Sequence, residues 1–178
     1  MILVGHSYGG AVITNAVHNN PKVKGLVYVA AFAPDKGETA IELSGRYPGG
    51  TLGPTLAAPV QLDDGNKDLY IQQDKFGQQF AADVAAADSA LMAATQRPIS
   101  EAALKEASGE PAWKKLPSWF IYGSADKNIP EAALKFMADR ASSKKTVTVQ
   151  GASHVVMTSN PQKVAELIIE AAQASSRG

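Results

Sequence analysis

Four short runs rich in apolar and β-branched residues predict the strands of one sheet. They lie at 2–4, 25–30, 119–122 and 146–149. In the first two runs the apolar residues are continuous rather than alternating, which is typical of strands buried on both faces of a parallel sheet. The pattern therefore predicts a sheet that is covered by helices on both sides.

Amphipathic stretches between and after these runs predict the helices. Residues 8–19 are mostly apolar, and a helix with Pro130 as its first residue has apolar side chains at i, i+3, i+4 and i+7, namely Leu134, Met137, Ala138 and Ala141. Asn160-Pro161 caps a last helix that carries Val164, Leu167, Ile168 and Ala171 on one face. Strands that alternate with helices predict an α/β fold with three layers.

Residues 35–115 have a different pattern and predict a lid. Glycine and proline cluster between Gly45 and Pro59, and alanine-rich helical segments follow at 76–87, 89–96 and 100–107, with no convincing strand. We therefore expect 35–115 to form a helical lid inserted between the second and third strands. The core then consists of 1–34 and 116–178.

Composition narrows the classes of function. The 178 residues, 45% of them hydrophobic, fit one globular domain. Seventeen basic and seventeen acidic residues, with no long run of either sign, do not favour nucleic acid or a membrane surface as partner, so a small neutral substrate fits better. No apolar stretch approaches the ~20 residues that cross a bilayer. The chain has no cysteine, which suits a reducing compartment, and we expect the cytoplasm.

A serine motif lies between the first predicted strand and the first predicted helix. Gly5-His6-Ser7-Tyr8-Gly9 matches G-x-S-x-G, in which small flanking residues let a strained strand-to-helix turn hold a serine hydroxyl above a sheet. A glycine-rich turn that serves packing alone is the alternative. The strand before the motif and the helix after it favour Ser7 as a nucleophile.

A serine nucleophile needs a base, and the chain has three histidines. His6 adjoins Ser7 and, on an extended strand, is expected to point to the opposite face. His18 lies eleven residues further along the predicted helix, roughly 16 Å away at ~1.5 Å per residue. His154 follows the fourth predicted strand and should reach the same sheet edge as Ser7, which makes it the candidate base.

The acid that orients the base should follow a strand and lie between serine and histidine in the chain. Asp126 meets both conditions, since it follows the strand at 119–122 and precedes the helix at Pro130. Asp35 follows the preceding strand and is the alternative. Either aspartate could instead satisfy backbone N–H groups in a turn.

With these residues the chain resembles the α/β-hydrolase superfamily, and within it the small-lid group of plant methyl-ester esterases, hydroxynitrile lyases and bacterial esterase-like relatives. The likeness rests on the Gly-His-Ser-Tyr-Gly-Gly sequence at 5–10, the Asp126 turn, and the segments 28–34, 153–157 and 159–162. It implies a Ser7 nucleophile, a His154 base, an Asp126 orienting acid and an oxyanion-hole donor in the N–H of Tyr8. Independently of this likeness, no cluster of His, Asp and Glu has metal-ligand spacing and no glycine-rich phosphate loop occurs, so we expect no cofactor and no metal.

The resemblance also ranks the functions. In lyases of the group a lysine follows the catalytic histidine, whereas this chain has Val155. Hydrolysis of small carboxylic esters is therefore favoured over cleavage of cyanohydrins. The third alternative is a non-catalytic protein that binds a small molecule, or an inactive relative.

The likeness covers the later part of the fold. In the family, several strands and a helix precede the serine turn, and a loop there supplies the second oxyanion-hole donor. We therefore expect a fold truncated at its N-terminus. Residues 2–4 would then form an exposed apolar sheet edge that is available for pairing in a homo-oligomer.

Overall fold

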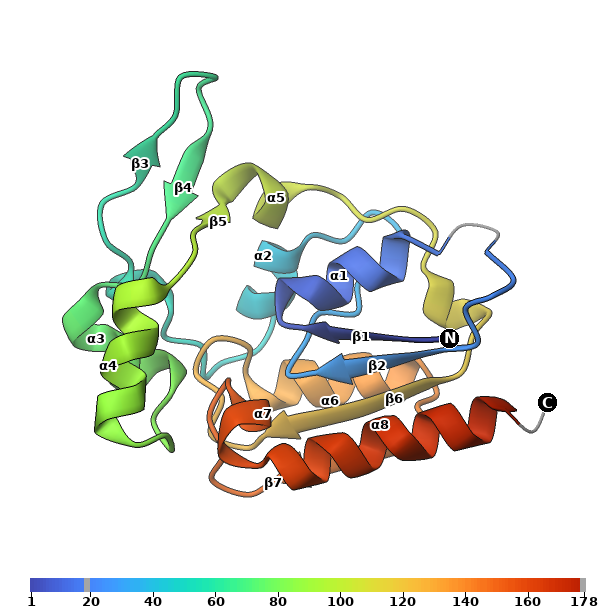
Figure 1. Ribbon diagram of the computed structural model, residues 1–178. Coiled ribbons are helices and arrows are strands. Elements are labelled where there is room, and N and C mark those ends of the chain that lie inside the picture. The colour runs from blue at the N-terminus through green and yellow to red at the C-terminus, as the bar shows by residue number, and fades with distance from the viewer. Residues whose placement is uncertain (18–19, 177–178) are drawn as a thin grey trace.

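The computed structural model describes residues 1–17 and 20–176, so His18 lies outside the described residues. Its central sheet has four parallel strands in the order β1-β2-β6-β7 (Figure 1). They are β1 (Ile2–His6), β2 (Gly25–Val29), β6 (Ser118–Gly123) and β7 (Lys145–Val149). All four predicted strands are confirmed.

Helices cover both faces of this sheet (Figure 1). They are α1 (Tyr8–Asn15), α6 (Glu131–Arg140) and α8 (Pro161–Ser176). Each crossover from β1 to β2 and from β6 to β7 moves one strand along in the same direction, so right-handed connections place α1 and α6 on one face. The chain then returns along the other face as α8, and the predicted three-layer arrangement follows.

The two central strands form the core. Every residue of β2 and of β6 is buried. The rings of Tyr28 and Phe120 stack with centroids 4.5 Å apart. Thr14 donates its hydroxyl proton to the carbonyl of Gly10, so the Tyr28 hydroxyl donates to Thr14 over 2.8 Å. This pairing satisfies the two buried hydroxyls and fixes α1 against the sheet.

The prediction that residues 35–115 contain no strand was wrong. Three short strands form an antiparallel sheet: β3 (Val60–Gln61), β4 (Lys67–Leu69) and β5 (Ile99–Ser100). Strands of two or three residues are too short to show a period. The hairpin turn did leave a signal, because Asp64-Gly65 is a sequence that favours tight hairpins, and Gly65 has a φ of 84°.

The predicted helices are present with different bounds. The 35–115 segment contains α2 (Ala40–Gly45), α3 (Gln73–Phe80), α4 (Ala86–Thr95) and α5 (Glu101–Lys105), with 3-10 turns at Gly53–Thr55 and Ala112–Lys114. The predicted helix 76–87 is interrupted after Phe80, and the helix at 8–19 ends at Asn15. Pro130 precedes α6 instead of starting it, since its ψ of 142° is extended.

Two apolar clusters divide the packing of residues 35–115. Leu43 and Trp113, near the two ends of this range, are buried in the main core. Between them, Ile71, Phe76, Ala81 and Ala93 form a second buried cluster together with Val155, which we call the lid cluster. The lid bounds 35–115 stay a prediction.

The strand β1 lies at one edge of the sheet and pairs with β2. Val4 on β1 is 44% exposed, while Ile2 and Leu3 are partly buried. Pairing of this edge with a second copy stays a prediction.

Candidate active site

Ser7 occupies a strained turn between β1 and α1. Its φ of 54° and ψ of −124° lie outside the regions that serine normally adopts. The turn is fixed by its surroundings, since the carbonyl of Ser7 accepts hydrogen bonds from the N–H groups of Gly10 and Phe32. A Cβ on Gly5 would lie 2.5 Å from the carbonyl oxygen of Gly9, so the turn requires glycine there. Strain of this kind is found where a structure positions a functional group.

The structure brings Ser7, His154 and Asp126 together at the carboxyl edge of the sheet. Nε2 of His154 lies 2.9 Å from Oγ of Ser7, and Nδ1 lies 2.7 Å from Oδ2 of Asp126. An ionised carboxylate can only accept, so Nδ1 of His154 carries the proton and Nε2 is free to accept the Ser7 proton. His154 is 1% exposed, so its ring is held almost without water.

The loop after β6 fixes Asp126. Oδ1 accepts the backbone N–H groups of Asn128 and Ile129, at 2.8 and 2.9 Å, which leaves Oδ2 for His154. The carboxyl is therefore buried, and its N–H donors hold it in the orientation that directs Oδ2 to His154.

The helix α3 contacts the same loop. Nε2 of the buried Gln79 donates to Oδ1 of Asn128 and to the carbonyl of Lys127, at 2.9 and 3.0 Å. Oε1 of Gln79 accepts the hydroxyl of Thr51 at 2.9 Å. A glutamine near the C-terminal end of α3 gave no sequence signal of this role.

The alternative acid, Asp35, is directed elsewhere. Its carboxylate pairs with Lys114 and accepts the N–H of Lys36, and the hydrogen bond from Lys114 holds the pKa of Asp35 below its usual value. Of the two aspartates, Asp126 is the one that contacts His154.

Tyr8 follows Ser7 directly and is the first residue of α1. Its N–H therefore belongs to the first turn of the helix, where N–H groups have no partner within the helix.

His6 does not point away from the site, and that prediction was wrong. Its Nε2 lies 2.9 Å from the backbone carbonyl of His154, and the two rings are 4.8 Å apart between centroids. The strand ends at His6 and Ser7 has a positive φ, so side-chain alternation along an extended strand does not extend through this turn. The proximity of His6 to Ser7 in the sequence was the available signal.

Phe80 of α3 reaches the same rings. Its ring meets that of His154 edge-on, with centroids 4.8 Å apart at 72°, and that of His6 at 6.4 Å and 87°. Phe76, four positions earlier on α3, is 4% exposed and lies in the lid cluster. Phe80 has the additional contact with the histidine pair.

Folding is expected to become less favourable as the pH falls from about 6.5 to about 4, and His6 is one cause. Burial, and then the charge on His154, lower the pKa of His6 to about 4. The unfolded chain therefore binds a proton on His6 at a higher pH than the folded chain. The stability of the fold that depends on neutral His6 is present in full above pH 6.5 and is lost as the pH falls toward 4. The full loss of unfolding free energy amounts to roughly 3 kcal/mol.

Urea unfolding at several pH values checks this prediction, with His6→Gln as the comparison. Glutamine does not titrate, so the variant should lose less stability between pH 7 and pH 4.5 than the unsubstituted chain. Equal losses in both proteins would show that His6 does not contribute to the acid sensitivity.

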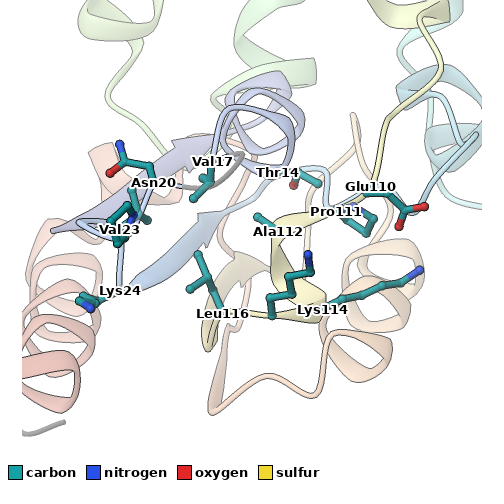
Figure 2. Close-up of a pocket in the computed structure, with 12 residues that line it drawn as sticks. Thr14, Val17, Asn20, Val23, Lys24, Glu110, Pro111, Ala112, Lys114 and Leu116 are labelled. Atoms are coloured by element: carbon teal, nitrogen blue, oxygen red, sulfur yellow. The ribbon is translucent and has the colours of Figure 1, made fainter.

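A cavity of about 700 Å³ lies apart from the Ser7 hydroxyl. Figure 2 shows it between the C-terminal half of α1, the 20–24 segment and the 110–116 segment. Its nearest α1 residue, Thr14, is seven positions beyond Ser7, roughly 10 Å along a helix.

Among the described residues no group of three potential ligands could hold a metal ion. None of the helices within residues 1–17 and 20–176 is long and apolar enough to cross a membrane.

Comparison with known proteins agrees with the fold. The sequence model of the alpha/beta hydrolase family matches residues 2–167. The chain belongs to this family. The resemblance noted from the serine turn, the Asp126 turn and the His154 loop is thereby confirmed, and so is the α/β-hydrolase fold class.

This alpha/beta hydrolase is similar to enzymes and to a binding protein of plants. It is 30% identical over 173 residues to an alpha-hydroxynitrile lyase of Arabidopsis thaliana, covering 92% of the chain and 67% of the relative. It is 26% identical over 182 residues to salicylic acid-binding protein 2 of Nicotiana tabacum, covering 97% and 70%. The structure of polyneuridine aldehyde esterase superposes with a TM-score of 0.78 at 17% identity, covering 97% and 71%. The chain thus spans about two thirds to seven tenths of the length of these relatives.

Proposed function

We propose that this alpha/beta hydrolase cleaves small carboxylic esters through an acyl-enzyme formed on Ser7. The observation that carries the proposal is the continuous hydrogen-bonded series from Ser7 Oγ through His154 to Asp126, with distances of 2.9 and 2.7 Å. A serine hydroxyl is a weak nucleophile until a positioned base takes its proton. This series supplies both the base and the group that orients it.

In the proposed reaction, Oγ of Ser7 attacks the ester carbonyl carbon while Nε2 of His154 takes the hydroxyl proton. The His154 imidazolium then gives this proton to the departing alkoxide, and the alcohol leaves an acyl group on Ser7. Water attacks the acyl group with His154 again as base, and the acid is released. Asp126 keeps the imidazole in the required tautomer and stabilises its positive charge. We assign the N–H of Tyr8 to the oxyanion.

The surroundings of His154 support an uncharged substrate. Phe80 meets the ring of His154, and Val155 is buried in the lid cluster with 1% exposure. Six partly buried apolar side chains also pack against that cluster: Leu52, Leu56, Phe80, Val84, Met92 and Met157. A charged acyl or alcohol group placed against such side chains would lose its hydration without a partner.

Cyanohydrin cleavage is the second candidate, because an alpha-hydroxynitrile lyase is among the relatives. The residue after His154 disfavours it, since Val155 is buried among apolar side chains and provides no cation for a cyanide leaving group. Cyanide released from a cyanohydrin by the purified chain, in the absence of ester hydrolysis, would reverse the ranking.

A fluorophosphonate probe tests the proposal on the 178-residue chain. We expect the intact mass to increase by one adduct, which peptide mapping places on Ser7, and Ser7→Ala to abolish the adduct. Ser44→Ala is the matched control, because Ser44 is an ordinary helix serine whose hydroxyl donates to the carbonyl of Ile41. It should label like the unsubstituted chain.

The contrary result would be a folded sample, shown by a cooperative thermal transition, that neither labels nor hydrolyses p-nitrophenyl esters. Ligand-induced thermal stabilisation that is equal in this sample and in Ser7→Ala would then indicate a binding protein.

A further inference from the structure

We propose that His6 is a positioning residue for His154: its Nε2–H holds the backbone carbonyl of His154, and its ring supports the His154 imidazole between Ser7 and Asp126. This inference rests on the proposed ester hydrolysis, because it assigns His6 a part in keeping the base of that reaction in place.

The first support is the direction of the hydrogen bond. A backbone carbonyl can only accept, so Nε2 of His6 must carry the proton in the 2.9 Å contact with the oxygen of His154. The two histidines therefore hold complementary tautomers, with the proton on Nε2 in His6 and on Nδ1 in His154. The donor of His6 acts on the main chain of His154, while Asp126 acts on its ring.

The second support is how the ring of His154 is surrounded. The ring of His6 lies 4.8 Å from it with an interplanar angle of 49°, and Phe80 meets it edge-on at the same separation. The imidazole of His154 is thus contacted by the ring of His6 from β1 and by the ring of Phe80 from α3. Hydrogen bonds fix its two nitrogen atoms, and these two rings restrict its tilt.

The third support is charge. The titratable groups that face His6 are His154 and Asp126, and burial together with the charge on His154 lowers the pKa of His6 to about 4. His6 is therefore neutral at neutral pH and stays neutral when His154 becomes an imidazolium in the reaction. A side chain with a permanent positive charge at this position would oppose that step, since like charges at this distance disfavour ionisation.

The position of His6 suits this role because it immediately precedes Ser7. His6 is the last residue of β1 and is bonded to the nucleophile, and its side chain links this end of β1 to the loop that carries the base. Any shift of the His154 loop relative to Ser7 would stretch the His6 hydrogen bond. The contact thereby couples two residues that are 148 positions apart in the sequence.

Two substitutions separate the parts of the proposal. His6→Gln keeps an N–H donor at about the reach of Nε2 and removes the ring, while His6→Phe keeps a ring and removes the donor. Val4→Thr is the control for changes in β1, since Val4 lies on the same strand and is 44% exposed. We expect His6→Phe to lower kcat and the fluorophosphonate labelling rate by 10-fold or more, with KM little changed. His6→Gln should recover most of this loss.

A proton NMR spectrum tests the same inference without turnover. The Nδ1–H of His154 should give a downfield resonance through its hydrogen bond to Asp126. We expect the resonance to persist in His6→Gln and Val4→Thr, and to broaden or vanish in His6→Phe at a pH where all three variants are folded.

The outcomes separate this inference from the proposed function. An unchanged resonance in His6→Phe, or the same loss of kcat in His6→Gln and His6→Phe, would overturn the role of the His6 donor. A chain that shows the expected changes in the resonance but has no Ser7-dependent turnover would leave the positioning contact in place and reject ester hydrolysis.

Discussion

Alanine in place of Ser7 is expected to lower kcat for ester hydrolysis by about 10⁶-fold, and alanine in place of His154 by about the same factor. The two act as one unit, because the hydroxyl attacks only while Nε2 of His154, 2.9 Å away, takes its proton. The double variant should therefore be no slower than either single variant. Stopped-flow or end-point assays with a chromogenic ester measure all three.

Asp126 completes the same unit with a smaller effect. Replacing it by alanine is expected to lower kcat by about 10⁴-fold, since the base survives but loses the group that fixes its tautomer. KM should change little in each case, because none of the three side chains is assigned to substrate binding. Losses that multiplied between Ser7→Ala and His154→Ala would contradict this arrangement and indicate that they act in separate steps.

The sequence predicted the serine, base and acid because each follows a strand, and parallel strands end at one edge of the sheet. Ser7 follows β1, Asp126 follows β6 and His154 follows β7. The four-stranded core could also be predicted, since strands of five or six residues leave runs rich in apolar and β-branched residues.

The parts that were missed depend on tertiary contacts or on very short elements. His6 lies in the turn where strand alternation stops, so no periodic rule gives its direction. Phe80 and Gln79 are adjacent on α3, and only the docking of that helix shows that one reaches His154 and the other the loop of Asp126. The strands β3 to β5 have two or three residues each, less than one full period of a detectable pattern.

Alanine in place of Gly123 is expected to reduce both stability and activity, because this glycine ends β6 where another chain segment crosses it closely. A Cβ at Gly123 would lie 2.0 Å from the carbonyl oxygen of Ala152 and 2.5 Å from its carbon. Both are backbone atoms, so the 152–153 segment must move. Overpacking of this kind costs about 3 kcal/mol of the free energy of unfolding, which urea unfolding measures.

The displaced segment leads directly into His154, so the same substitution should also lower kcat. His154 must stay within hydrogen-bond distance of Ser7 and of Asp126, and a misplacement of about 1 Å costs on the order of 10²-fold in rate. Gly45→Ala is the matched control, since a Cβ at that exposed helical position meets no atom within 4 Å. It should leave kcat unchanged and stabilise α2 slightly. A Gly123→Ala protein that loses stability but keeps its full kcat would show that the loop relaxes without moving the His154 imidazole. The position of the imidazole would then depend on its contacts with His6, Phe80 and Asp126 more than on the backbone of residues 152–153.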